Sequence, residues 1–443
     1  MPAQLLTVAA AIVALVALVT AWRVPPFLAF LVVSIGALIG LGYPADVAEP
    51  SIAGTLQKGM GAVFGQLAVT LVAGAMLGRL VVASGAAQRI AGVLCTAAGP
   101  GRVGWAMAAT GFVVGIPLFY GVAFMLLLPI IRAVAARGRL PLIGVALPAC
   151  AAMSVAHGLL PPHPAPTALV PLFKADMGRT LLLGTIVSLP AIVVGGPLFV
   201  RCLRGLRAAP PDTSAAPPAT DDALPGTVVS FLTALLPVYL LGGASLLAWR
   251  PPSDPIVARF LALASAPDLV MLVALAIAAV TLGIARGTSL PDVMGIYGTA
   301  IADVAPTLLV IAGSGAFRQV LVDTRVDAAL ADALRGLPLD PLLLAWGVTA
   351  VLRVCIGSAT VAGLTAAGIL APLLADAGTD PDLAVLAVGA GTLFCSHVND
   401  VAFWMFRDAF GTSLADTARS WTAMESIVSV VALATVVVLD RVL

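Results

Sequence analysis

The chain has 443 residues, of which 60% are hydrophobic and only 10% are charged, and its mean hydropathy is +1.09. A water-soluble chain typically carries about 25% charged residues. Apolar runs here repeatedly reach the length of about 18 residues that can cross a bilayer. These values exclude a string of soluble domains, and the net charge of +1 provides no basic surface for nucleic acid. The composition predicts an all-α polytopic membrane protein.

The apolar segments expected to be helical are separated by one polar stretch near the middle of the chain. They lie at 4–22, 26–43, 64–83, 103–131, 140–160, 180–200, 227–248, 267–285, 304–322, 342–374, 383–397 and 420–439. The Pro- and Ala-rich stretch 205–226 predicts a cytoplasmic linker at the membrane surface. We therefore expect a first membrane repeat at 1–204 and a second at 227–443.

The N-terminal segment is not expected to be a cleaved signal. Its first charge, Arg23, follows the apolar stretch, whereas a signal peptide carries positive charge before it. By the positive-inside rule this order predicts an N-terminus outside and Arg23 in the cytoplasm.

The two halves of the chain match at a nearly constant offset of 239 to 241 residues, which indicates a duplicated unit. The matching positions are Ala73-Gly74 with Ala312-Gly313, Arg79 with Arg318, Trp105 with Trp346, His157 with His397, and Ile186-Val187-Ser188 with Ile427-Val428-Ser429. Each match is weak alone, but their common offset is not expected by chance.

Loop charges indicate that the two repeats have opposite orientations. One loop of the first half carries Arg132, Arg137 and Arg139, and the corresponding loop of the second half carries Asp376, Asp380 and Asp382. The positive-inside rule places the first loop inside and the second outside. In the inverted arrangement, however, four arginines fall outside, against this rule: Arg250, Arg259, Arg325 and Arg335. A parallel duplication therefore stays open. The inverted arrangement predicts about five transmembrane helices and one re-entrant hairpin in each repeat.

Two segments are too long for one crossing and too short for two. Residues 103–131 and 342–374 each have glycine and polar residues at the middle, in Gly115–Tyr120 and Gly357–Thr360. Such interruptions are tolerated in a membrane only where they line protein or a wet cavity. We expect a re-entrant hairpin at each place.

A broken helix is expected after each hairpin. Residues 154–167 include four prolines, which remove amide donors and clash with preceding carbonyls. Residues 396–400 are the polar counterpart, and the three histidines of the chain, His157, His163 and His397, lie in these two stretches. Inverted repeats with broken helices are common in secondary transporters, whose substrate sites lie near the membrane midplane.

These stretches resemble the gluconate permease (GntP) family. The resemblance rests on Gly74–Gly78 with Ser84–Ile90, on His157–Pro164 with Pro166-Thr167, on Arg353–Thr360, and on Ser396–Asp400 with Phe403-Trp404. It runs from about residue 70 to 430 and implies a proton symporter for gluconate or a related sugar acid in the bacterial inner membrane. Family relatives also carry other hydroxylated acids or D-serine. The resemblance further implies the wider ion-transporter superfamily, with paired hairpins and broken helices.

The chain departs from the family pattern at two places. Gly121 follows Phe119-Tyr120, where relatives often have an acidic residue, and Ala165 stands where glycine is usual. If the acidic residue carries protons in relatives, another group does so here or the substrate differs. These departures leave the substrate identity open.

The residues expected to bind substrate lie at the hairpin tips and helix breaks, where free amides and short polar side chains suit a carboxylate and hydroxyls. They are Gly115, Tyr120, His157, His163, Thr167, Gly357, Ser358, Thr360, Ser396, His397 and Asn399. The alternative for glycine and serine is close helix packing. The alternative for the histidines is a structural hydrogen bond. No cofactor or metal site is expected, and oligomerisation stays open.

Asp400 and His157 are the expected proton-coupling groups. A membrane carboxylate is costly when ionised, and histidine titrates near neutral pH. The alternative for Asn399-Asp400 is that they cap a helix start. Arg353 either pairs with a substrate carboxylate or, as we slightly favour, holds a structural carboxylate such as Asp303 or Glu425.

The sequence favours a secondary active importer over its rivals. No HExxH motif, phosphate loop or acidic cluster indicates an enzyme. A passive channel and a sodium-coupled symporter stay open, since sequence gives neither energetics nor stoichiometry.

Overall fold

The computed structural model describes residues 2–43, 51–98, 102–203, 224–248, 254–324 and 339–443, and every regular element in these ranges is a helix. Seven of these helices are long and apolar enough to cross a membrane. An eighth is added if the bent pair Thr227–Ala234 and Leu236–Leu247 counts as one span. The prediction of an all-α polytopic membrane protein is confirmed. Most of the expected linker, residues 205–223, lies outside the described ranges, as do Arg250, Arg325 and Arg335.

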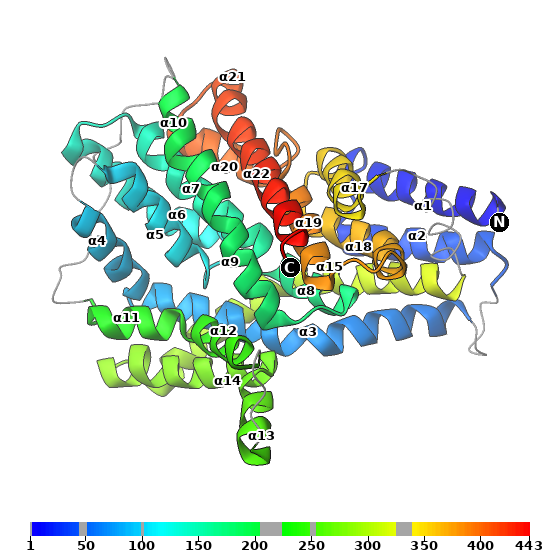
Figure 1. Cartoon of the computed structure of the whole chain (residues 1–443), viewed down its shortest axis with the longest axis horizontal. Helices are drawn as coiled ribbons and strands as arrows, with labels where there is room; N and C mark the ends of the chain where they lie inside the picture. The colour runs from blue at the N-terminus through cyan, green and yellow to red at the C-terminus, as the bar shows by residue number, and fades with distance from the viewer. Residues whose placement is uncertain (1, 44–50, 99–101, 204–223, 249–253, 325–338) are drawn as a thin grey trace.

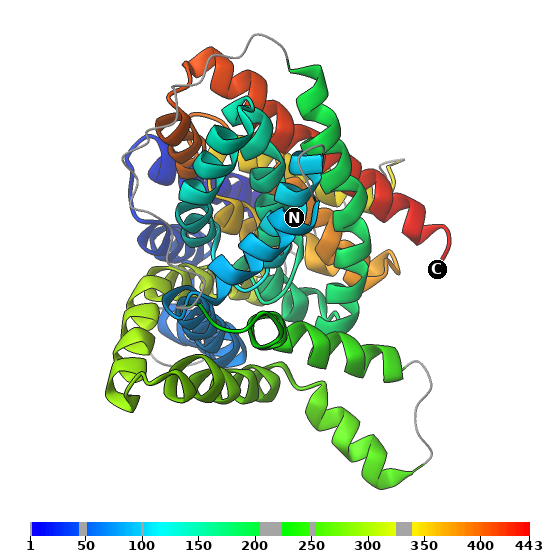
Figure 2. The same cartoon turned by 90° about the vertical axis from the view of Figure 1, so that its left-hand side faces the viewer.

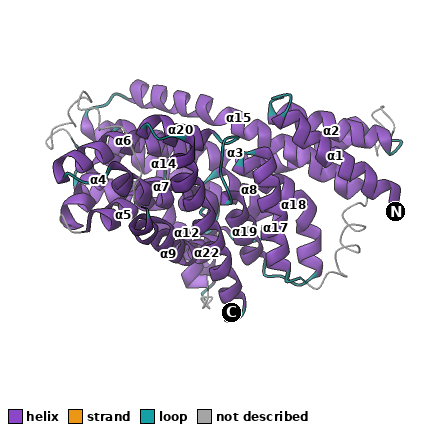
Figure 3. Cartoon of the chain, turned by 90° about the horizontal axis from the view of Figure 1, so that it is seen from above, coloured by secondary structure: helices purple, strands orange, loops and turns teal. Residues whose placement is uncertain are grey.

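The first half of the chain forms ten helices within the described residues. They are α1 (Pro2–Thr20), α2 (Pro26–Gly40), α3 (Ile52–Ala83), α4 (Ala86–Ala98), α5 (Val103–Gly115), α6 (Tyr120–Gly138), α7 (Leu142–Leu159), α8 (Pro164–Phe173), α9 (Met177–Val193) and α10 (Phe199–Cys202). A π-helical segment, Val194–Leu198, joins α9 to α10. Helices α1 and α2 form one end of the molecule, and α4 lies near the other end (Figures 1 and 3).

The second half begins with α11 (Thr227–Ala234), α12 (Leu236–Ala248), α13 (Pro255–Ala264), α14 (Pro267–Ala278) and α15 (Leu290–Asp323). It continues with α17 (Pro341–Ile356), α18 (Ala359–Asp376), α19 (Pro381–Leu393), α20 (Val401–Phe410), α21 (Leu414–Thr417) and α22 (Ala423–Asp440). A π-helical segment, Ala418–Thr422, precedes α22. Helix α13 projects from the rest of the bundle (Figure 2).

The same order of elements occurs in both halves. A long helix, α3 or α15, leads to a helical hairpin, a broken helix and a further long helix. The equivalent contacts also recur, since α5 packs on α7 as α17 packs on α19, and α7 packs on α9 as α19 packs on α22. This recurrence agrees with a duplicated unit. The inverted orientation of the repeats stays a prediction.

The hairpins turn where the sequence predicted. Helices α5 and α17 have 13 and 16 residues, which is short of the roughly 20 residues that span a bilayer. The first hairpin turns at residues 116–119, between α5 and α6. The second turns at Gly357 and Ser358, and the backbone φ of +81° at Gly357 is a conformation that favours glycine.

The first helix break is short. Helix α7 continues through Leu159, so His157 lies in its last turn, and only residues 160–163 are non-helical. Pro164 and Pro166 lie in the first turn of α8, where a missing amide hydrogen is tolerated because that amide has no helical partner. The prediction that 154–167 is not one continuous helix is therefore confirmed, and His157 lies just before the break rather than within it.

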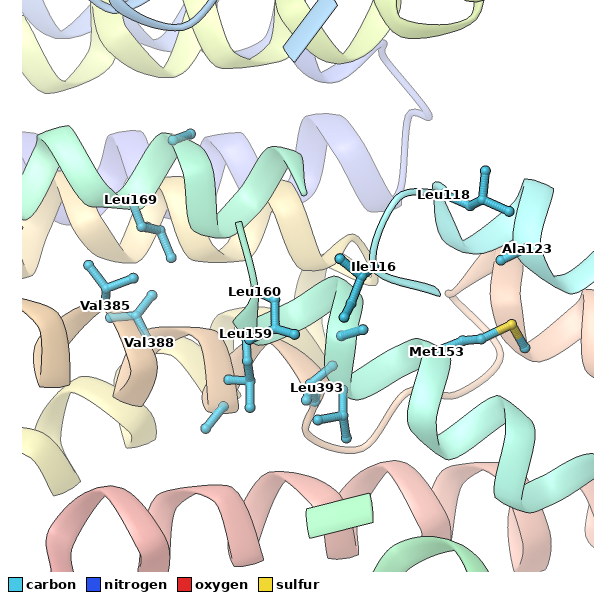
Figure 4. Packing of buried hydrophobic residues seen from close by; sticks show 14 of the residues in the cluster. Ile116, Leu118, Ala123, Met153, Leu159, Leu160, Leu169, Val385, Val388 and Leu393 are labelled. Carbon is cyan, nitrogen blue, oxygen red and sulfur yellow. The ribbon is translucent and has the colours of Figure 1, made fainter. Parts of the chain in front are cut away.

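The two broken helices cross at a pair of glycines. A methyl group added at Gly389 of α19 would lie 2.6 Å from the carbonyl oxygen of Gly158 in α7. Figure 4 shows Leu159, Leu160 and Leu393 packed around this crossing, and all three are buried. Small residues let helix backbones approach closely in membrane proteins. The crossing brings both breaks to the same region of the bundle.

Candidate functional site

A hydrogen-bonded histidine pair links the first hairpin tip to the first helix break. His163 is 3% exposed, and its Nε2 atom donates to the Gly115 carbonyl oxygen at 2.8 Å. The Nδ1 atoms of His157 and His163 are 3.3 Å apart. Because a carbonyl only accepts, a neutral His163 has its proton on Nε2 and accepts at Nδ1 from His157. The free nitrogen of His157, Nε2, is then an acceptor, and no described residue occupies it.

Tyr120 joins this pair to the second half of the chain. Its ring makes edge contacts with His157 and Trp421, at centroid distances of 6.5 and 5.7 Å. Its hydroxyl is buried beside the Cys150 thiol and has no stronger polar partner within the described residues. A thiol is a weak hydrogen-bond partner, and a buried hydroxyl without a strong one is unfavourable. Tyr120 is therefore available to a bound polar molecule.

Arg353 in the last turn of α17 forms an ion pair with Asp400 through Nη2. Its Nε atom donates to the Thr392 carbonyl at 2.7 Å, whereas Nη1 is buried without a partner in the described structure. The expected pairing with a structural carboxylate is present, with Asp400 as the ion-pair partner and Glu425 as an electrostatic neighbour. Asp303 lies 3.5 Å from Arg79 instead, because α15 packs on α3 rather than on the end of α17.

Asp400 has both a structural and an electrostatic role. Its Oδ1 atom accepts from the Ala402 amide at 3.0 Å, so it is the N-cap of α20. Its Oδ2 atom accepts from Arg353 and from the Ser396 hydroxyl. Ser396 also accepts from the Trp421 indole at 2.8 Å. The capping alternative is therefore present together with the ion pair.

Glu425 in the first turn of α22 was proposed from sequence only as a partner of Arg353. Its side chain is buried, at 1% exposure, and interacts electrostatically with Arg353 and Asp400. Ser154 of α7 is a polar neighbour of its carboxylate, whereas its Oε1 atom has no partner among the described residues. The signal in the sequence was its rarity. Glu49 and Glu425 are the two glutamates of the chain, and Glu425 alone lies inside an apolar segment.

Asn399 and Gly357 hold the second break against the second hairpin. The Asn399 amide nitrogen donates to the Val354 carbonyl at 2.8 Å, which satisfies an end of α17. A methyl group at Gly357 would lie 2.3 Å from the Asn399 carbonyl oxygen. These two residues therefore have a clear packing function, and the hairpin tip cannot accept a larger residue at 357 without moving.

The other expected site residues have different surroundings. Ser358 is the N-cap of α18 and accepts from the Val361 amide at 3.4 Å, and Thr360 lies in the first turn of that helix. Thr167 is buried in α8, and its hydroxyl has no partner among the described residues. His397 is partly exposed and accepts from the Asn399 amide at 3.4 Å. No hydrogen bond or ring contact in the described structure joins His397 to the histidine pair.

The assembled site offers three kinds of polar group to a small molecule. Arg353 Nη1 is a cationic donor suited to a carboxylate. His157 Nε2 and Glu425 Oε1 are acceptors, and Tyr120 can donate or accept. His157 interacts electrostatically with Arg353 and Asp400, which connects the first half of the site to the second. The arrangement suits an anion that also carries hydroxyl groups.

Comparison with known proteins identifies one family over nearly the whole chain. The model of the GntP family permeases matches residues 3–442. The chain is 39% identical to the high-affinity gluconate transporter of Escherichia coli K12, over 99% of this chain and 100% of that protein. It is also 39% identical to the Gnt-II system L-idonate transporter of the same organism, over 99% of both chains. The gluconate permease of Bacillus subtilis 168 is 37% identical, again over 99% of both.

Solved structures of more distant transporters share the fold. The Alcanivorax borkumensis YdaH transporter aligns with a TM-score of 0.65 at 19% identity, over 94% of this chain and 98% of that one. MtrF of Neisseria gonorrhoeae aligns with a TM-score of 0.61 at 15% identity, over 94% of both. At these identities the likeness shows the fold alone. The full-length family match and the close relatives establish that this chain belongs to the GntP family of permeases and is a multi-pass membrane transporter, not an enzyme.

Proposed function

We propose that the protein is a secondary active transporter that imports gluconate, or a closely related small sugar acid, together with protons across the bacterial inner membrane. The names of its relatives support a sugar acid as substrate, since they include gluconate and L-idonate transporters. The two Escherichia coli relatives are equally similar to this chain, so overall identity favours neither acid.

The observation that carries this proposal is the buried guanidinium of Arg353. Its Nη2 atom pairs with Asp400, whereas its Nη1 atom has no protein partner in the described structure. A buried donor without a partner costs free energy, and a substrate carboxylate would remove that cost. Arg353 therefore anchors the acid group in this proposal.

The polar residues around Arg353 then recognise the hydroxyl groups. His157 and Tyr120 present an acceptor and a hydroxyl, and His163 fixes the orientation of His157. The full proposed binding set keeps the positions expected from sequence: Gly115, Tyr120, His157, His163, Thr167, Gly357, Ser358, Thr360, Ser396, His397 and Asn399. Of these, Gly357 and Asn399 act by shaping the second hairpin tip.

Proton coupling belongs to the charged cluster of Arg353, Asp400, Glu425 and His157. An ion pair buried among apolar helices changes its net charge when one acid takes up a proton, and a neighbouring anion then binds more readily. Asp400 and His157, the two coupling groups expected from sequence, both belong to this cluster. The proton is proposed to enter with the acid and leave with it.

Uptake of labelled gluconate into proteoliposomes tests the proposal. With an acid-outside pH gradient we expect accumulation above equilibrium, and a protonophore should abolish it. A sodium gradient in place of the pH gradient should drive no accumulation. Uptake that never exceeds equilibrium would indicate a passive channel. Accumulation of D-serine or glycerate, but not of gluconate, would show that gluconate is not the substrate.

A further inference from the structure

Glu425 is a buried acid with an unoccupied oxygen. Its side chain is 1% exposed, Ser154 is a polar neighbour of its carboxylate, and Oε1 has no partner in the described structure. The ionisable groups that face it come from four elements: Tyr120 at the start of α6, Cys150 in α7, Arg353 in α17 and Asp400 at the start of α20. An ionised carboxylate without full hydrogen bonding is unfavourable in such surroundings, and one added proton removes the buried charge.

Asp400 is already engaged as the counter-ion of Arg353. Its Oδ2 atom accepts from Arg353 and Ser396, and its Oδ1 atom accepts from the Ala402 amide at 3.0 Å. A proton on Asp400 would neutralise this carboxylate and leave the Arg353 charge buried without its counter-ion. Loss of one partner of a buried ion pair is strongly destabilising. Of the two acids, Glu425 can be protonated without removing the counter-ion of Arg353.

The charges of the cluster lead to the same distinction. With Asp400 and Glu425 both ionised, one positive and two negative charges are buried together. With a proton on Glu425 the protein charges balance, and Arg353 Nη1 is left to meet an incoming carboxylate. Because a like charge disfavours an anion and an opposite charge favours it, proton and anion should each strengthen the binding of the other.

We propose that Glu425 is the group that takes up the co-transported proton, while Asp400 remains the fixed counter-ion of Arg353. This inference rests on the proposed function, proton-coupled import of a sugar acid. It assigns the coupling proton to a residue outside the sites expected from sequence, and it gives Asp400 a positioning role. Protonation of Glu425 and arrival of the substrate carboxylate at Arg353 are then one linked event.

Replacement of Glu425 by glutamine tests this assignment. Glutamine keeps the size and an acceptor oxygen but cannot exchange a proton. In proteoliposomes, Glu425→Gln should lose accumulation driven by the pH gradient and retain exchange of internal for external gluconate. The exchange should also lose its dependence on pH. A variant that accumulates gluconate like the wild type would overturn the assignment.

Asp382→Asn is the matched control. Asp382 is a second buried acid, at 3% exposure, but its oxygens are occupied by Arg179 and Thr180, each at 2.6 Å, at the start of α19. It lies outside the proposed binding set, and this variant should still accumulate gluconate against a gradient. Equal loss of accumulation in both variants would point to a general effect of removing a buried acid and would contradict a specific role for Glu425.

A labelling experiment on the unmodified protein covers the case in which Glu425→Gln fails to fold. Hydrophobic carbodiimides react with protonated carboxyl groups in apolar surroundings, and mass spectrometry locates the adduct. Glu425 should be labelled, less so as the pH rises, and Asp400 should not. Labelling of Asp400 without Glu425 would overturn the inference. If the wild type itself never accumulates gluconate under a pH gradient, the proposed function fails, which is distinct from failure of Glu425 alone.

Discussion

The Nδ1 atoms of His157 and His163 lie 3.3 Å apart, and this contact sets the direction of a short hydrogen-bond chain that begins at the Gly115 carbonyl. His163 donates to Gly115 and accepts from His157, so the outer nitrogen of His157 is left as an acceptor. An acceptor suits a substrate hydroxyl rather than a carboxylate. In the proposed function, the histidine pair and Arg353 therefore bind different parts of a sugar acid.

His163→Ala should weaken gluconate binding. The substitution leaves the Gly115 carbonyl without its donor and releases the ring of His157. Loss of a buried hydrogen bond of this kind costs about 1–3 kcal/mol, which corresponds to a rise in KM of roughly 5- to 150-fold if the whole loss falls on binding. Initial uptake rates over a range of gluconate concentrations measure the change. His397→Ala should raise KM less, because His397 is partly exposed and makes no contact with the pair; equal effects would contradict the arrangement described for His163.

Ser358 offers a test that separates helix capping from substrate binding. Its hydroxyl caps α18, and an N-cap serine is replaced by alanine at a cost of about 0.5–2 kcal/mol but by glycine at only a few tenths. If the hydroxyl also contacts substrate, Ser358→Ala and Ser358→Gly should both raise KM for gluconate. Thermal unfolding should distinguish them, with the alanine variant less stable. Normal uptake by the glycine variant would show that the Ser358 hydroxyl caps α18 and does not contact the substrate.

Asp400→Asn should lower stability and abolish accumulation. The variant leaves the Arg353 charge buried without its counter-ion, a loss of about 3–5 kcal/mol in comparable sites. Because Arg353 then loses its fixed orientation, exchange of gluconate should fall together with accumulation. Exchange and pH-driven uptake measured on the same proteoliposomes check this. Full exchange without accumulation would indicate that Asp400, and not Glu425, takes up the coupled proton.

Close packing between α3 and α15 should make one glycine of each helix irreplaceable. A methyl group at Gly59 would lie 2.4 Å from the Gly315 carbonyl oxygen, and one at Gly315 would lie 2.5 Å from that of Gly59. Gly59→Ala or Gly315→Ala should lower the unfolding temperature by several degrees, a loss of about 1–3 kcal/mol from overpacking. Gly61→Ala, on the same helix with nothing within 4 Å, should be neutral or slightly stabilising. Tolerance of all three variants would contradict the close approach.

The class and the outline of the fold follow from the sequence for direct physical reasons. A bilayer requires long apolar runs whose backbone groups bond internally, so composition and run length predict membrane helices. Proline and glycine interrupt helices locally, so both hairpin tips were predicted within a few residues. The interruption of 154–167 was predicted as well, but its exact place at 160–163 was not, because Pro164 and Pro166 begin a helix rather than interrupt one. Their effect depends on where the helix starts, which a list of prolines does not contain.

The pairing within the site was decided by the tertiary structure. Arg353 and Asp400 are 47 residues apart, and their contact depends on how the second break folds back against the end of α17. Glu425 became a candidate for the coupling proton only through its position beside that pair with an oxygen unoccupied. Sequence determined which residues are polar within the membrane, because each one is costly there. Only the folded chain decided which of those polar groups satisfy one another and which are left for a substrate or a proton, because hydrogen bonds and ion pairs require contact.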